Sequence, residues 1–200
     1  MSNTFTSAEV FSPFEVDQFA IKMKGASAYE RDDCVGSLNV ERETRTVTKK
    51  CRGIVKKRKT KATGNGTVTV SMHIKLALIR SMTGMTNEGL QPGIYGYKNT
   101  ESMPEFACVA RVKDEDDNIL FKAWPVCVME ELNVLNVENG AEEVAEIEIK
   151  FNYQPDENGI GEYEALETEL TGQILTGENW MTDFSPINAT TGEDSDDDDE

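Results

Sequence analysis

The chain has 200 residues, of which 38% are hydrophobic, and its formal net charge at neutral pH is −17. This length and composition suit one domain with a single core. No apolar run approaches the roughly 20 residues of a membrane span, and the first residues lack the basic and apolar regions of a secretion signal. We therefore expect a chain that is made in the cytosol and does not insert into a membrane.

The charge is distributed unevenly. Residues 42–62 contain ten of the 20 cations and one acid, Glu43, whereas residues 123–200 contain 22 acids and one base, Lys150. Unlike charged patches attract and steer association. This polarity favours head-to-tail contact between copies of the chain.

The N-terminal part of the chain indicates an arm and then a strand. Residues 1–15 are predicted to form the arm, whose phenylalanines dock on the chain's own core or on a neighbouring copy. Residues 20–24 alternate apolar and polar side chains before Gly25, which predicts the first strand.

A long hairpin is predicted next. Residues 38–48 alternate and are rich in Thr and Val, which favours a strand. The sequence Gly64-Asn65-Gly66 predicts the turn, because Gly and Asn tolerate positive φ, and residues 68–74 form the most regular alternation of the chain. The polar, basic stretch before this turn would extend the hairpin beyond any core.

The remaining pattern indicates strands with few helices. A helix is predicted over 76–82, ended by Gly84. Strands follow over 106–112 and 119–129, joined by a turn at 114–118, with a bulge or edge at Pro125. A strand over 147–153 and a short helix over 163–170 complete the predicted elements. The fold class is therefore mainly β, a β-sandwich or barrel-like sheet, with one or two short flanking α-helices and a long basic hairpin loop.

The C-terminal end of the chain differs in composition. We expect one domain over residues 16–187 and a disordered acidic tail over 188–200, because Glu193–Glu200 holds seven acids in eight residues. The tail either solubilises the chain or shields the basic hairpin before assembly. In the second case, deleting residues 193–200 should speed self-association.

Catalytic and cofactor motifs are missing from the sequence. It has no nucleophile elbow, phosphate loop or dinucleotide fingerprint. His73 is the only histidine, and no residue can be named that would orient it as a general base. We expect neither an enzyme nor a cofactor.

Metal sites are also not expected. The four cysteines are too widely spaced for a zinc site and are predicted to be reduced thiols that fill space: Cys34, Cys51, Cys108 and Cys127. Residues 156–167 match an EF-hand loop at Asp156, Asn158, Gly161 and Glu167, but Ile160 stands at a ligand position. This segment is predicted to be a turn that leads into a helix.

Two charged segments are candidate contact sites. The first is the basic hairpin: Lys49, Lys50, Arg52, Lys56, Lys57, Arg58, Lys59 and Lys61. It would meet the acidic portion of the next copy, bind nucleic-acid phosphates, or simply be solvated; it lacks interleaved aromatic residues for base stacking. The second is a possible acidic lumen or contact stripe: Glu142, Glu143, Glu146 and Glu148.

Several segments in order resemble one known family. They are GTVTVSMHI (66–74), MTGM (82–85), FKAWPVCV (121–128), EEVAEIEI (142–149), YEALE (163–167) and NWMTDF (179–184). This layout resembles the major tail proteins, or tail tube proteins, of siphophages and prophages of Gram-positive bacteria, over roughly residues 15–187.

The resemblance implies a structural virion protein, built in the host bacterial cytoplasm. Its copies would form hexameric rings that stack into a tail tube through which genomic DNA passes. Its other partners would be the tape measure, tail terminator and baseplate or distal tail proteins. Cations in the lumen would grip DNA, so the basic hairpin is expected at the contact between rings. The alternatives are a nucleic-acid-binding module that uses residues 49–61, or another tail-completion or decoration protein.

Overall fold

The structure is a computed structural model, and it describes residues 11–99, 102–131, 139, 144–170 and 174–190. The strands are β1 (Pro13–Met23), β2 (Glu30–Asp32), β3 (Val35–Cys51), β4 (Ile54–Met72), β5 (Glu105–Asp114), β6 (Ile119–Glu131), β7 (Ile147–Tyr153) and β8 (Tyr163–Leu166). The helices are α1 (Leu76–Met82), α2 (Gly177–Asp183) and α3 (Pro186–Ala189), with a 3₁₀ turn at Glu167–Glu169. The predicted mainly β class is confirmed.

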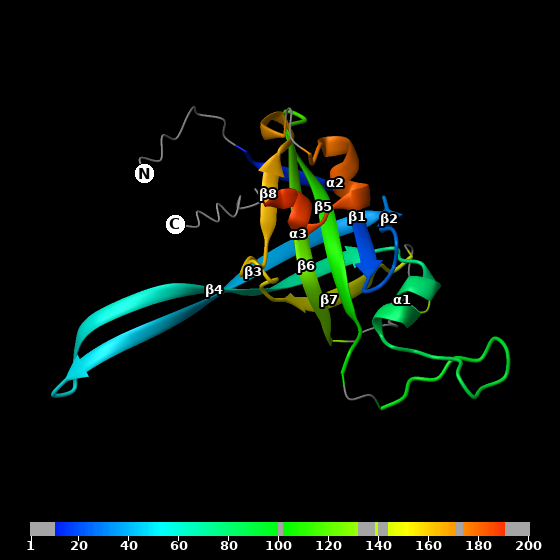
Figure 1. Ribbon diagram of the computed structural model, residues 1–200, viewed down its shortest axis with the longest axis horizontal. Coiled ribbons are helices and arrows are strands. Elements are labelled where there is room, and N and C mark those ends of the chain that lie inside the picture. The colour runs from blue at the N-terminus through cyan, green and yellow to red at the C-terminus, as the bar shows by residue number, and fades with distance from the viewer. Residues whose placement is uncertain (1–10, 100–101, 132–138, 140–143, 171–173, 191–200) are drawn as a thin grey trace, which may run out of the picture.

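The strands form a single antiparallel sheet with the order β2-β1-β5-β6-β7-β4-β3, and β8 pairs with β6 beside this path. The sheet curls, so that β1 and β3 contact each other although no ladder joins them among the described residues. Figure 1 shows the curled sheet, with α1 beside one end of it and α2 against β5 and β1. Of the two expected architectures, the barrel-like sheet describes the molecule better.

The core occupies the concave side of the sheet. Phe151 of β7 packs edge-on against Phe106 of β5 at 5.4 Å between ring centroids, and Phe19 of β1 lies 6.4 Å from it. Alternate residues of β4, including Val68 and Val70, are fully buried in the same cluster. The period of two in these strands therefore separates a buried face from a polar face.

A second, smaller cluster covers the other side of β1, β5 and β6. Trp180 of α2 stacks on Phe121 of β6 at 5.7 Å and contacts Phe184 at 4.8 Å. The N-terminus of α2 is capped by Thr176, whose hydroxyl accepts a hydrogen bond from the backbone N–H of Asn179. The sequence pattern did not predict the helix that carries Trp180.

The long hairpin is confirmed, but the predicted position of its turn is wrong. Cys51 pairs with Ile54, so the turn consists of Arg52 and Gly53, both with positive φ (51° and 79°). Two-residue hairpins favour this geometry because its twist matches the strands. The sequence Gly64-Asn65-Gly66 instead lies inside β4, where the register with β3 shifts between Arg42 and Thr44.

Close packing explains why glycines stand inside that strand. A side chain on Gly66 would place its Cβ 2.2 Å from the carbonyl oxygen of Glu41 and 2.3 Å from the hydroxyl of Tyr153. Gly64 has a φ of +81°, which L side chains rarely adopt. The turn-like composition therefore marks a bulge and a close backbone approach.

The helix predicted over 163–170 is also wrong. Residues 163–166 form β8, in which Ala165 pairs with Phe121 of β6, and only the 3₁₀ turn follows. The first strand, predicted over 20–24, begins earlier, at Pro13, so residues 13–15 of the predicted arm belong to β1. Further predictions are confirmed: α1 ends before Gly84, which has a φ of +68°, and β6 has a register shift at Pro125. None of the helices in the described ranges is long and apolar enough to cross a membrane.

The four cysteines are free, but they do not share one environment. Cys108 and Cys127 are buried in the core, as expected for space-filling thiols, and burial raises the pKa of the Cys108 thiol. Cys34 and Cys51 are exposed, so the space-filling prediction is wrong for them. Cys51 lies beside the hairpin turn, beyond the reach of any core side chain.

The variant Phe151→Ala should lower the free energy of unfolding by about 3–5 kcal/mol, because it empties a ring-sized space in the core. Chemical denaturation followed by tryptophan fluorescence measures this change. Ile187→Ala is the control: its side chain is 83% exposed, so it should change stability by less than about 0.5 kcal/mol. Similar losses in both variants would contradict the burial of Phe151.

Candidate functional site

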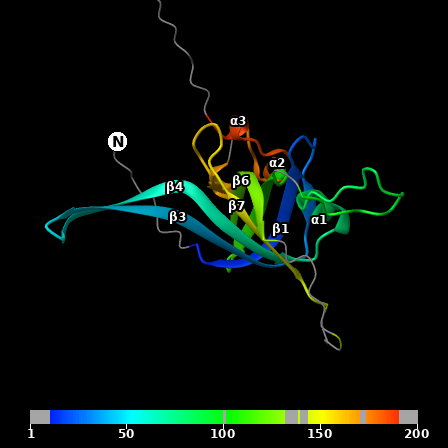
Figure 2. The same cartoon turned by 90° about the horizontal axis from the view of Figure 1, so that it is seen from below.

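The part of the β3–β4 hairpin beyond the register shift, residues 44–62, is called the cationic hairpin here. It projects from the body of the molecule in both views (Figure 1 and Figure 2). It contains nine cations and no acid, and every one of its residues is exposed. At about 3.3 Å per residue, each arm extends roughly 25 Å.

The register sorts the side chains of the cationic hairpin onto two faces. Residues directly opposite each other in an antiparallel ladder lie on the same face. One face, called the cationic face, carries Val47 and five cations: Arg45, Lys49, Lys57, Lys59 and Lys61. The other, called the threonine face, carries Thr44, Thr46, Thr48, Thr60 and Arg58. The hydroxyls of Thr46 and Thr60 lie 3.1 Å apart, which confirms their common face.

Like charges oppose each other directly on the cationic face. Lys49 pairs with Lys57, and Arg45 pairs with Lys61. Such cross-strand pairs are unfavourable in an isolated ladder. Within the described part of the chain, no cation of the hairpin forms an ion pair. The arrangement therefore suits an anionic partner that lies outside the described residues.

Polar side chains fasten the base of the hairpin. Glu43 accepts hydrogen bonds from the hydroxyl of Thr63 and the side-chain amide of Asn65, both at 3.0 Å. These bonds hold the pKa of the Glu43 carboxyl below its ordinary value. They also bridge the register shift, so the bulge has one defined conformation at the point where the hairpin leaves the core.

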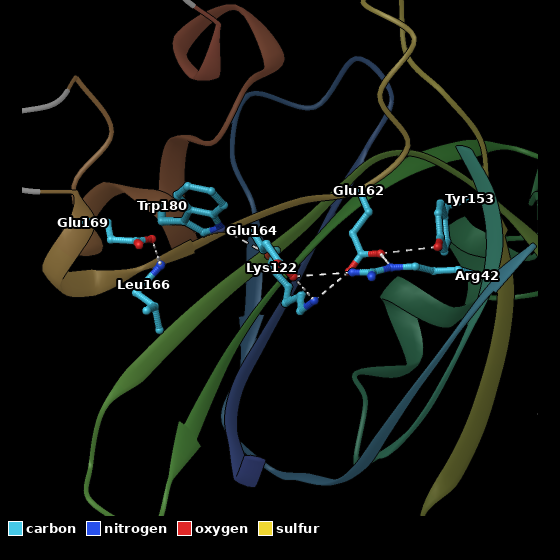
Figure 3. A network of polar contacts seen from close by, with 8 residues as sticks. All are labelled: Arg42, Lys122, Tyr153, Glu162, Glu164, Leu166, Glu169 and Trp180. Carbon is cyan, nitrogen blue, oxygen red and sulfur yellow. Dashed lines mark hydrogen bonds and ion pairs between the residues drawn. The ribbon is translucent and has the colours of Figure 1, made fainter. Parts of the chain in front are cut away.

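A buried carboxylate lies next to this base (Figure 3). Glu162, whose side chain is only 7% exposed, accepts hydrogen bonds from Arg42 Nε and Lys122 Nζ, both at 2.7 Å. Lys122 Nζ also contacts Glu164 at 2.5 Å, and the indole N–H of Trp180 donates to the backbone oxygen of Lys122. The network joins β3, β6, β8 and α2.

The charges of this network stabilise one another. Burial would raise the pKa of Glu162, but the hydrogen bonds from Arg42 and Lys122 outweigh it and hold the pKa below its ordinary value. Burial, together with the nearby Glu162 carboxylate, raises the pKa of Tyr153 to about 12. Glu162 therefore stays ionised at neutral pH. Its ion pair with Arg42 joins the base of the hairpin to the body of the molecule.

The outer edge of β3 is a further candidate contact. Among the described residues, β3 pairs only with β4, and the first half of β1 pairs only with β5. A groove of about 630 Å³ separates these two edges, lined by Phe14, Val16, Leu38 and Val40 among others. Phe14 is 78% exposed, so this predicted anchor does not dock on the chain's own core. Unpaired edges of this kind accept a strand from another chain.

The acidic stripe is only partly within the described residues. Glu142 and Glu143 lie outside them. Glu146 and Glu148 are exposed, with Ile149 buried on the opposite face of β7, as the alternation predicted. Glu148 opposes Ser71 of β4, and together they belong to a polar face that none of the described helices covers (Figure 2).

The EF-hand-like segment is a turn. One oxygen of Asp156 accepts bonds from the backbone N–H of Asn158 and Ile160, and the other accepts from the hydroxyl of Tyr163 at 2.6 Å. These bonds occupy the carboxylate that a cation would need. His73 is exposed just after β4, and no cluster of three or more metal-binding side chains occurs in the described ranges.

Sequence reasoning identified the eight cations of the basic hairpin but missed Glu162. Its partners lie 120 and 40 residues away, and nothing in the local sequence distinguishes it from the other acids around it.

The variant Glu162→Gln should lower the free energy of unfolding by about 3 kcal/mol at neutral pH, because two cations lose a buried partner. The lowered pKa of Glu162 means that its contribution is present above the ordinary Glu pKa of about 4.3 and is lost as pH falls below it. Urea titrations at several pH values should therefore show the two proteins converging in acid.

Glu105→Gln provides the matched control for this variant. Glu105 pairs with Lys24 at an exposed site, where an ion pair contributes less than about 1 kcal/mol. An equal loss in both variants, or a difference from wild type that does not shrink in acid, would contradict the buried network.

Comparisons with known proteins identify no family. No family model matches the chain, and no curated protein matches it. Among solved structures, it is similar to a protein described as the anti-feeding prophage cap, which terminates a tube, studied by cryo-electron microscopy. The two are 11% identical, the match covers 83% of this chain and 99% of that chain, and the TM-score is 0.43.

Proposed function

We propose that the chain is a structural subunit of a phage-type tail, which assembles into hexameric rings that stack into a tube for DNA. The observation that carries this proposal is the cationic hairpin. It presents nine cations without a single acid, whereas the whole chain has a net charge of −17. A chain divided in this way attracts other copies of itself in a fixed orientation.

The two ends of the molecule support head-to-tail contact. The cationic hairpin projects on one side, and the loop after α1 projects on the opposite side in both views (Figure 1 and Figure 2). That loop exposes Leu90, Ile94, Tyr95 and Tyr97. Two unlike projecting surfaces suit heterologous contacts, which close into rings or continue as filaments.

The sheet supports the same proposal. Pairing the free edge of β3 with a strand of the next copy would satisfy its backbone groups and remove an exposed edge. The uncovered face of β4 and β7 is polar, with Thr67, Thr69 and Asn152 among its residues, and it would suit a water-filled lumen. The cationic hairpin then belongs at the contact between rings, away from DNA.

Negative-stain electron microscopy across a concentration series tests the proposal first. Stacked rings or tubes with a central channel are expected at high protein concentration. Small single particles at every concentration would contradict it. Salt-sensitive DNA binding by such particles would then favour the nucleic-acid alternative.

Charge reversal on the cationic face should prevent stacking. The double variant Lys57→Glu, Lys59→Glu is expected to fold normally, because both side chains are exposed, but to lose at least about tenfold in assembly, measured by light scattering. The matched control is Lys24→Glu, Lys75→Glu, which makes the same change in net charge elsewhere on the surface. Equal effects of both pairs would contradict a role for the hairpin, as would a tube map with Lys57 and Lys59 in the channel.

A further inference from the structure

We propose that the acidic C-terminal segment, Glu193–Glu200, docks on the cationic face of the hairpin of its own chain before assembly. Seven of the eight residues in this segment are acids. The cationic face carries five cations on one side of a two-stranded ribbon, and none of them has a partner among the described residues. The two surfaces are complementary in charge and belong to the same molecule.

Repulsion between like charges in the isolated hairpin would favour this contact. The opposed pairs Lys49–Lys57 and Arg45–Lys61 hold like charges at adjacent positions, which is unfavourable unless counter-charge is supplied. An extended acidic segment laid along the ribbon would place carboxylates between these cations. Charge-assisted hydrogen bonds from lysine and arginine to carboxylates are stronger than neutral ones.

A series of contacts links the end of α2 to the base of the hairpin. Phe184, just after α2, packs on Tyr163 of β8 with 5.4 Å between ring centroids. The residue before Tyr163 is Glu162, which binds Arg42 at the base of the hairpin. Arg45 follows about 10 Å further along β3, and its side chain lies on the face opposite to that of Arg42, because the two positions differ by an odd number of residues. The last ten residues of the chain span up to about 35 Å when extended, which exceeds the roughly 25 Å length of one arm of the hairpin.

The two faces of the hairpin allow docking on the cationic face to be distinguished from a general attraction of the acidic segment to the positive charge of the whole hairpin. Side chains on opposite faces of a ribbon are separated by about 10 Å, which is close to the Debye length in physiological salt. The acids should therefore respond to the loss of cations on one face more than on the other. The threonine face, with Arg58 and the neighbouring Lys50, provides a matched set of charges.

Cys51 supplies a natural position for a probe, because it is exposed and lies at the end of the cationic face. In a Cys34→Ser variant, a nitroxide spin label on Cys51 leaves only buried thiols unlabelled. The test is paramagnetic broadening of the backbone amide signals of residues 193–200 in the full-length, ¹⁵N-labelled chain, below the concentration at which it assembles.

Strong broadening of these signals at low salt, lost in high salt, is expected. The variant Lys57→Gln, Lys59→Gln should reduce the broadening at least about threefold, whereas Lys50→Gln, Arg58→Gln should leave most of it. No broadening in the parent, or equal losses in both variants, would overturn the proposal. A mixing experiment distinguishes docking on a neighbouring copy: one copy carries the spin label without ¹⁵N, and the other carries ¹⁵N without the spin label. Broadening that occurs only in this mixture would also overturn the proposal, because the segment would then dock on a neighbour.

The docked segment would compete with other copies for the cationic face and so delay assembly. This consequence rests on the proposed function, whereas the docking itself does not. Replacing the seven acids by their amides should lower the concentration at which tubes appear by at least about threefold. If no variant forms tubes while the broadening persists, the proposed function fails and the docking stands.

Discussion

The antiparallel ladder between β3 and β4 continues for eight residue pairs beyond the bulge, where neither strand buries a side chain. A two-stranded ribbon in water is marginally stable, and this one carries opposed like charges. Its position therefore depends on its base. There, Glu43 bridges the bulge, and the nearly buried Glu162 side chain pairs with Arg42. The exposed cations have a defined place because polar contacts at the base of the hairpin hold the strands that carry them.

The same arrangement separates charge within one molecule. The body is acidic, and the Glu162 carboxylate within it is neutralised by Arg42 and Lys122, whereas the hairpin cations have no such partner in the described part of the chain. The proposed ring contact and the proposed docking of the acidic segment are two ways of supplying that partner. They compete for one surface, so a chain that shields its hairpin when free can still use it when another copy displaces the segment.

The sheet is incomplete in a way that fits association. It curls until β1 and β3 touch, yet a groove lined by apolar side chains remains between their free edges. Closing that gap within one chain would leave no edge for a neighbour. The concave side is filled by aromatic residues around Phe151, while the convex side is covered by α2 over β5 and left polar over β4 and β7.

The sequence by itself determined the mainly β class, the helix that ends before Gly84 and the strands around Val70, Val109 and Ile149, because alternation and helix termination are local properties. It also located the cations of the hairpin. Only the tertiary structure decided where the hairpin turns, since Gly66 is required by the approach of Glu41 and Tyr153 and not by a turn. The role of Glu162 and the division of the hairpin into two faces likewise depended on register and on contacts between distant residues, which no local pattern encodes.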